Sequence, residues 1–137
     1  MSFAERLEDR SALLYERLSE QFPAHADLFK SFARENTMNK VLLTRTYQET
    51  VTDALETGFS FEGLNLNDAI PGDAWTDSQE LSEAVNNALM LERASVAFYA
   101  DIADRARTLL STIYTAFNKV ERARRNRLAK LESLKAL

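Results

Sequence analysis

The chain has 137 residues, of which 45% are hydrophobic and 28% are charged, a balance typical of one soluble globular domain with a sizeable core. It contains no cysteine, which excludes disulfides, thiolate metal sites and cysteine nucleophiles. No signal peptide or transmembrane run stands out, so we expect a cytoplasmic protein that does not bind membranes. With 3 Gly and 2 Pro, long helices are favoured over turn-rich β structure.

The net charge of −4 is unevenly distributed along the chain. Residues 105–137 carry nine Lys and Arg against two acidic residues, Glu121 and Glu132. Such a basic segment could meet an acidic partner, or acidic residues of neighbouring helices. Because no groove-reading motif accompanies the charge, we expect no nucleic-acid binding.

Apolar residues recur every three to four positions through four segments, which predicts four long helices. They are expected at about 3–21, at 26–57, at 78–106, and from Thr108 or Ser111 to about 134. A turn around Pro23 separates the first two, and Gly58 ends the second. Residues 76–80 resemble a capping box at the start of the third.

The segment 58–77 is the only long non-helical stretch, and Trp75 is expected to anchor it on the helices. About twenty residues is the length needed to cross from one end of a helix pair to the other. The order of short connection, long crossover and short connection predicts one all-α domain over 1–137. Its expected architecture is a four-helix bundle of two helical hairpins.

One seven-residue spacing occurs twice. Glu8 precedes Tyr15, and Glu92 precedes Tyr99, and each Glu lies on the apolar stripe of its predicted helix. A carboxylate that faces a core is costly unless something pairs with it. The function of this chain therefore depends on what pairs with these two carboxylates.

The second helix of each predicted hairpin also follows a shared pattern, in which two aromatic residues precede two polar ones. The copies are Phe29, Phe32, Asn36, Asn39 and Tyr114, Phe117, Glu121, Arg124. In an antiparallel bundle these polar residues can meet Glu8 and Glu92 in one layer, with Tyr15 and Tyr99 beside it. If the second helix were shifted by one residue, Glu35 and Met38 would face the core instead. The rotation that keeps Phe29 and Phe32 facing the core favours Asn36 and Asn39.

This pattern resembles the rubrerythrin-like branch of the ferritin-like superfamily, in which each half supplies one Glu and one Glu-x-x-His to hold two irons. The resemblance implies a ferritin-like bundle, a homodimer, and metal-ligand positions at Glu8, Glu92, Glu121, Asn36 and Asn39. Asn36 stands where the family has its second Glu. Asn39 and Arg124 stand where it has the two His, and the single histidine, His25, falls in the first turn.

Arg124 places a permanent cation where a metal ligand belongs, so we expect no normal di-iron centre, no cofactor and no enzymatic activity. The predicted function is a non-catalytic structural, binding or regulatory module. One alternative is a metal-binding oxidoreductase of the di-iron peroxidase or oxidase type, with iron or manganese.

Two further alternatives remain open. Three Glu against one Arg give the predicted layer a net charge of about −2. One magnesium, calcium or manganese ion bound by Glu8, Glu92, Glu121 and Asn36 would offset this charge. The chain could also be a helical adaptor that binds an acidic partner through Arg122, Arg125 and Arg127 of the last helix.

Overall fold

The computed structural model describes residues 2–47, 49–57, 80–108 and 110–135. Within these ranges every regular element is a helix, so the predicted all-α fold is confirmed. The predicted crossover at 58–77, with Gly58 and Trp75, lies outside the described residues. So does the predicted capping box, apart from Glu80, which precedes the third long helix without a side-chain cap.

Helix α1 spans Phe3–Gln21, as predicted, and begins with a reciprocal cap. The Ser2 hydroxyl accepts a hydrogen bond from the Glu5 N–H at 3.2 Å, and Glu5 Oε1 accepts from the Ser2 N–H at 3.1 Å. Two N–H groups that have no partner inside the helix are thereby satisfied. A short 3₁₀ helix, η1 (Pro23–His25), then reverses the chain.

The predicted second helix, 26–57, is wrong as one continuous element. Helix α2 ends at Thr46 (Ala26–Thr46), Tyr47 is extended with ψ 125°, and α3 follows as Glu49–Thr57. The Thr46 hydroxyl donates to the carbonyls of Leu42 and Leu43, a local bond that competes with the regular helix. The buried residues of α3 are Thr52 and Leu55, and Val51 packs against the core beside them.

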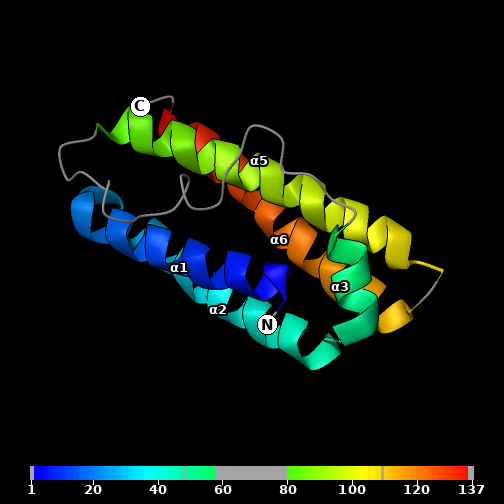
Figure 1. The fold of residues 1–137 in the computed structure, drawn as a ribbon. Coiled ribbons are helices and arrows are strands. Elements are labelled where there is room, and N and C mark those ends of the chain that lie inside the picture. Colours follow the sequence, from blue (N-terminus) through cyan, green and yellow to red (C-terminus); the bar gives the residue numbers. More distant parts are fainter. Residues whose placement is uncertain (1, 48, 58–79, 109, 136–137) are drawn as a thin grey trace.

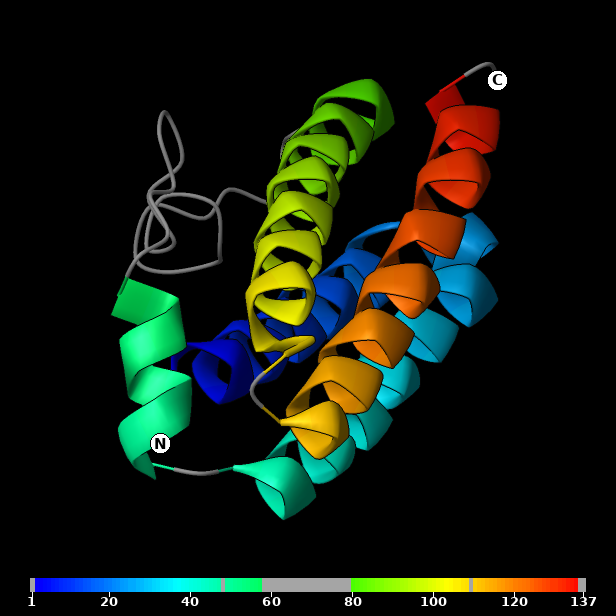
Figure 2. The same ribbon diagram turned by 90° about the vertical axis from the view of Figure 1, so that its right-hand side faces the viewer.

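Helix α3 turns away from α2 and stands beside the start of α1 (Figure 2). There the Glu56 carboxylate accepts hydrogen bonds from the N–H groups of Phe3 at 2.9 Å and Ala4 at 2.8 Å. Arg105 donates to the Leu55 carbonyl on the other side. An anion at a helix N-terminus is favourable because it faces the positive end of the helix dipole.

Helices α5 (Leu81–Ala106) and α6 (Ser111–Lys135) form the second predicted hairpin. Figure 1 shows α1 lying along α2 and α5 lying along α6, with the two pairs stacked on each other. This arrangement is compatible with a four-helix bundle. Among the described helices, none has an apolar stretch long enough to cross a membrane.

Apolar side chains from all the long helices and α3 meet in one core. It includes Leu7, Leu14, Phe29, Phe32, Leu43, Leu55, Leu89, Phe98, Ile102, Phe117, Val120 and Leu131. Aromatic rings make edge contacts in it, such as Phe3 with Phe98 at 5.3 Å between ring centres. The polar groups of the candidate site, described next, lie in this same interior and are shielded from solvent by the surrounding apolar side chains.

A buried ion-pair layer as the candidate functional site

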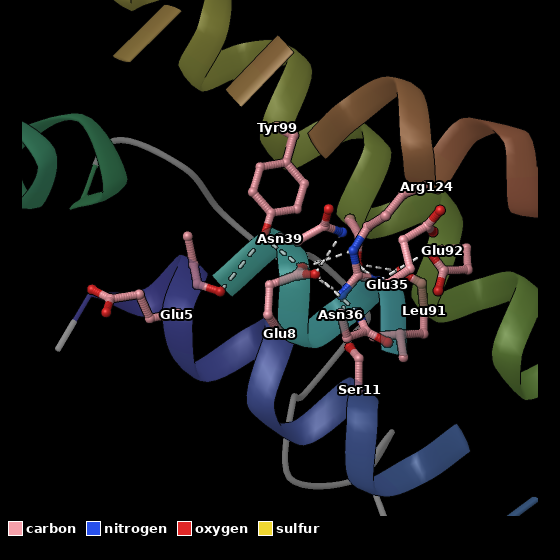
Figure 3. A network of polar contacts seen from close by, with 12 residues as sticks. Glu5, Glu8, Ser11, Glu35, Asn36, Asn39, Leu91, Glu92, Tyr99 and Arg124 are labelled. Carbon is pink, nitrogen blue, oxygen red and sulfur yellow. Dashed lines mark hydrogen bonds and ion pairs between the residues drawn. The ribbon is translucent and has the colours of Figure 1, made fainter. Parts of the chain in front are cut away.

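Ten polar or aromatic side chains from four helices meet in the middle of the molecule, and we call this set the central layer. It consists of Glu8, Ser11, Tyr15, Asn36, Asn39, Glu92, Ser95, Tyr99, Arg124 and Arg127, each at most 7% exposed. In Figure 3 the side chains of Glu8, Asn36, Asn39, Tyr99 and Arg124 converge from α1, α2, α5 and α6. The predicted convergence of Glu8, Asn36, Asn39, Glu92 and Arg124 is confirmed, with both tyrosines beside them.

Helical periodicity positions the first helix of each hairpin. Glu8, Ser11 and Tyr15 lie on one face of α1, and Glu92, Ser95 and Tyr99 occupy the same spacing on α5. The repeated unit is therefore Glu-x-x-Ser-x-x-x-Tyr, which adds a serine to the repeated Glu–Tyr spacing. The repeated serine is the signal in the sequence that could have extended the predicted site.

Arg124 lies between the two copies of this unit and uses all five of its N–H donors. Its Nε and Nη2 donate to Glu8 Oε2 at 2.9 and 2.6 Å, and its Nη1 donates to Glu92 Oε2 at 3.0 Å. The remaining donors reach Ser11 Oγ at 2.8 Å and Ser95 Oγ at 3.2 Å. A buried guanidinium is tolerated only when it is paired and hydrogen-bonded in this way.

The tyrosines connect the two halves reciprocally. Tyr15 of α1 donates its hydroxyl proton to Glu92 Oε1 of α5 at 2.6 Å, while Tyr99 of α5 donates to Glu8 Oε2 of α1 at 2.7 Å. Each Glu is therefore held by the tyrosine of the other hairpin. The layer thus has an approximate two-fold symmetry that the sequence spacing alone did not predict.

Helix α2 turns Asn36 and Asn39 toward the layer, as the positions of its aromatic residues predicted. Asn36 and Asn39 each donate from Nδ2 to Glu8 Oε1, at 2.9 and 3.0 Å. Met38 is 72% exposed, so the alternative phase with Glu35 and Met38 facing inward is wrong. Glu35 reaches only the edge of the layer, where its Oε1 accepts from Arg127 Nε at 2.9 Å.

Arg127 is the second cation of the layer, although the sequence pattern predicts it on an exposed basic face. Its Nη1 donates to Glu92 Oε1 at 3.0 Å and to Asn36 Oδ1 at 3.3 Å, and its Nη2 donates to the Phe32 carbonyl at 3.1 Å. The guanidinium also lies over the Tyr15 ring, 5.4 Å from its centre. Only 1% of Arg127 is exposed. The structure therefore does not place Arg127 on the exposed face that the adaptor alternative needs.

Glu121 is the predicted site residue that the structure does not bring into the layer. Its carboxylate is turned along α6 and accepts from Arg125 Nε at 2.7 Å, one helical turn further on. Arg125 is largely exposed, so this pair lies at the edge of the fold. The positions facing the layer from α6 are instead Arg124 and Arg127.

The charges of the layer balance. Two carboxylates, Glu8 and Glu92, face two guanidinium groups, Arg124 and Arg127, and all four side chains are buried. The predicted net charge of about −2 is therefore wrong, because Glu121 lies outside the layer and Arg127 lies within it. Among the described residues, no buried side-chain nitrogen or oxygen lacks a hydrogen-bond partner.

The layer shifts the pKa values of its members in the directions that favour these pairs. Burial acts to raise the pKa of Glu92, but Arg124 and Arg127 outweigh it and hold that pKa below its ordinary value. Burial, followed by the nearby carboxylate, raises the pKa of both Tyr15 and Tyr99 well above 10.0. Both tyrosines therefore stay protonated and act as donors to the two Glu.

The donor set does not fit a two-iron centre. Such a centre needs anionic and imidazole groups turned toward an open coordination space. Glu8 and Glu92 are turned toward guanidinium groups, the asparagines present N–H groups to Glu8, and His25 lies in η1. Within the described ranges, no cluster of three or more His, Asp or Glu side chains is placed to hold a metal.

Comparison with protein-family models, with curated proteins and with solved structures finds no match for this chain. What the central layer does is therefore inferred from its own geometry and charge.

Proposed function

We propose that this chain is a ferritin-like four-helix bundle, of the rubrerythrin-like kind, in which two arginines occupy the position of the metal centre. It acts as a non-catalytic structural, binding or regulatory module. The observation that carries the proposal is Arg124, a fully buried cation that contacts both repeated carboxylates and both repeated serines.

The charge balance supports this proposal over the two metal-binding alternatives. A divalent ion between Glu8 and Glu92 would have to displace Arg124, whose five hydrogen bonds would then be lost in a dry interior. It would also lie beside Arg127, a second buried cation. The repeated unit on α1 and α5 supports the two-hairpin, ferritin-like part of the proposal.

The adaptor alternative is left with fewer residues. Of the three arginines assigned to an acidic partner, Arg127 is buried and Arg125 is paired with Glu121, so Arg122 alone keeps that role. We therefore favour the bundle with an internal ion-pair layer.

Metal analysis after purification without a chelator tests the proposal. We expect substoichiometric iron and manganese, and a melting temperature that does not change on addition of a chelator. Stoichiometric metal that stabilises the fold would overturn it.

A gain-of-function variant is the sharper test. The combination N36E/N39H/R124H/R127L replaces both cations and supplies carboxylate and imidazole donors at the same level of the bundle. We expect it to bind iron, whereas the matched variant N36E/N39H, which keeps both arginines, should not. Equal iron binding by the two variants would show that the arginines do not occupy the metal position.

A further inference from the structure

Helix α3 is a short helix whose stability depends on its docking against α1 and α5. It has nine residues, and four of them are Val or Thr, whose branched side chains lower helix propensity. Isolated helices shorter than about 12 residues are marginal in water even when their sequence is favourable. Tyr47 leads into α3 with an extended backbone, so no continuous helix from α2 supports it. Docking and helix formation of α3 are therefore one event.

A small set of contacts docks α3 on the bundle. Among its described side chains, Thr52 and Leu55 are buried, at 2% and 6% exposed, whereas α5 buries thirteen residues. Arg105 of α5 donates to the Leu55 carbonyl, and Glu56 accepts from the first two N–H groups of α1. A segment opens at a free energy that follows the contacts it breaks, so α3 opens more readily than the long helices.

Ala4 connects α3 to the central layer. Its N–H donates to Glu56, and its carbonyl accepts from the Tyr99 hydroxyl at 3.5 Å, beside the 2.7 Å bond from Tyr99 to Glu8. Burial and Glu8 raise the pKa of Tyr99 most, and Glu56 raises it further, so the Glu56 carboxylate is within electrostatic reach of this hydroxyl. Helix α3 therefore lies at the Tyr99 end of the layer, beside the start of α1 (Figure 2).

Tyr15 has the equivalent position at the other end of the layer. Its hydroxyl contacts Glu92, and its ring packs against Phe29 and Phe32 of α2. Tyr15 and Ala4 are eleven residues apart on α1, which corresponds to roughly 16 Å along the helix. The two buried tyrosines therefore form a matched pair, one beside α3 and one remote from it.

We propose that α3 is a gate for the central layer, which opens as a unit while α1, α2, α5 and α6 stay folded and admits water and small solutes to Tyr99 and Glu8. Opening removes the two acceptors of Glu56 from the first turn of α1, so the Ala4 carbonyl is no longer held against Tyr99. Closing restores the helix, the bond from Arg105 and the cap on α1 in one step. This gate does not depend on whether the layer binds a metal.

Nitration of the tyrosine rings by tetranitromethane, followed by peptide mass spectrometry, measures the opening. When opening and closing are fast, the reaction rate follows the population of the open state. We expect Tyr99 to react faster than Tyr15 in the wild-type protein. Low urea should speed Tyr15 strongly and Tyr99 only weakly, because opening of α3 exposes much less surface than global unfolding. Equal rates with equal urea dependence would overturn the proposal.

Two glycine substitutions separate the opening of α3 from global unfolding. Ala54 is exposed on α3 and Ala129 is exposed on α6, and glycine should weaken either helix by a similar amount. Ala54→Gly should speed the nitration of Tyr99 about fivefold, whereas Ala129→Gly, in a helix that stays folded in the open state, should not change it. Tyr15 reacts through global unfolding and should respond alike to both variants. If Tyr99 also responds alike to both variants, or to neither, α3 is not a gate.

Hydrogen exchange tests whether α3 and the start of α1 open together. Arg105→Ala removes the donor to the Leu55 carbonyl, so the amides of α3 and the first two amides of α1 should exchange faster by one common factor of about ten. Arg107→Ala is the matched control, because the Arg107 side chain is 62% exposed and pairs with an aspartate of its own helix. Faster exchange of α3 in Arg105→Ala without faster nitration of Tyr99 would show that α3 opens without uncovering the layer, and would refute the gate.

Discussion

Replacing Arg124 by leucine tests the central layer most directly. The substitution keeps an apolar side chain on α6 but removes the cation that contacts Glu8 and Glu92. Glu92 keeps Arg127 at 3.0 Å, whereas Glu8 keeps only neutral donors from Asn36, Asn39 and Tyr99. Glu8 therefore becomes a buried carboxylate without a counter-ion.

The expected loss follows from these remaining contacts. Removing one partner of a buried pair costs about 3–5 kcal/mol of unfolding free energy. Three neutral donors still reach Glu8, so we expect about 3 kcal/mol, the lower end of that range. A domain of this kind has about 5–15 kcal/mol in total, so the variant should remain folded but markedly weaker.

Urea unfolding followed by circular dichroism measures this difference, and the neighbouring residue supplies the control. Arg125→Leu removes a largely exposed arginine whose partner is Glu121, and should cost less than about 1 kcal/mol. Adding Glu8→Gln to the Arg124→Leu variant should recover part of the loss, because the uncompensated charge disappears. Equal effects of the two arginine substitutions would refute the view that Arg124 neutralises the layer.

Three further predictions concern the remaining partners. Tyr15→Phe and Tyr99→Phe should each cost about 1–3 kcal/mol, because each removes one hydrogen-bond donor to a buried carboxylate, Glu92 or Glu8. The two losses should not simply add in urea titrations, because Arg124 contacts both carboxylates and joins them in one network. Because the folded-state pKa of Glu92 lies below its ordinary value near 4.5, its contribution is present above that pH and lost as the pH falls through the folded-state pKa. Acid titration of stability should therefore be flatter in Glu92→Gln, and an unchanged slope would contradict the assignment. Glu56→Gln should cost about 0.5–1 kcal/mol by removing one of the two oxygen acceptors at the start of α1, and hydrogen exchange should show faster opening of residues 3 and 4.

Helical phase made much of the central layer predictable. Glu8, Glu92 and Asn36 lie on otherwise apolar stripes, and the 3.6-residue period leaves such positions little freedom to face solvent. The same reasoning fails on α6, where Arg127 is expected on the surface with Arg122 and Arg125 but is buried. Val120, Arg124, Arg127 and Leu131 also follow helical spacing, but an arginine is normally exposed and its burial depends on partners from other helices.

The break after Thr46 could not be predicted, because no glycine or proline lies between residues 26 and 57. Besides the local bond of the Thr46 hydroxyl, tertiary contacts favour the break: the Glu56 carboxylate caps α1, and Arg105 donates to the Leu55 carbonyl. Such contacts override local propensity and leave no local pattern in the sequence.

The unequal distribution of charge between the hairpins also specifies how they assemble. In the central layer, α1 and α2 contribute one anion, Glu8, whereas α5 and α6 contribute Glu92 with Arg124 and Arg127. Neither hairpin is neutral alone, so two copies of the first would bury two uncompensated carboxylates, and two copies of the second would bury surplus cations. A duplicated architecture is thereby protected against pairing like halves, because only the unlike pair yields a neutral interior.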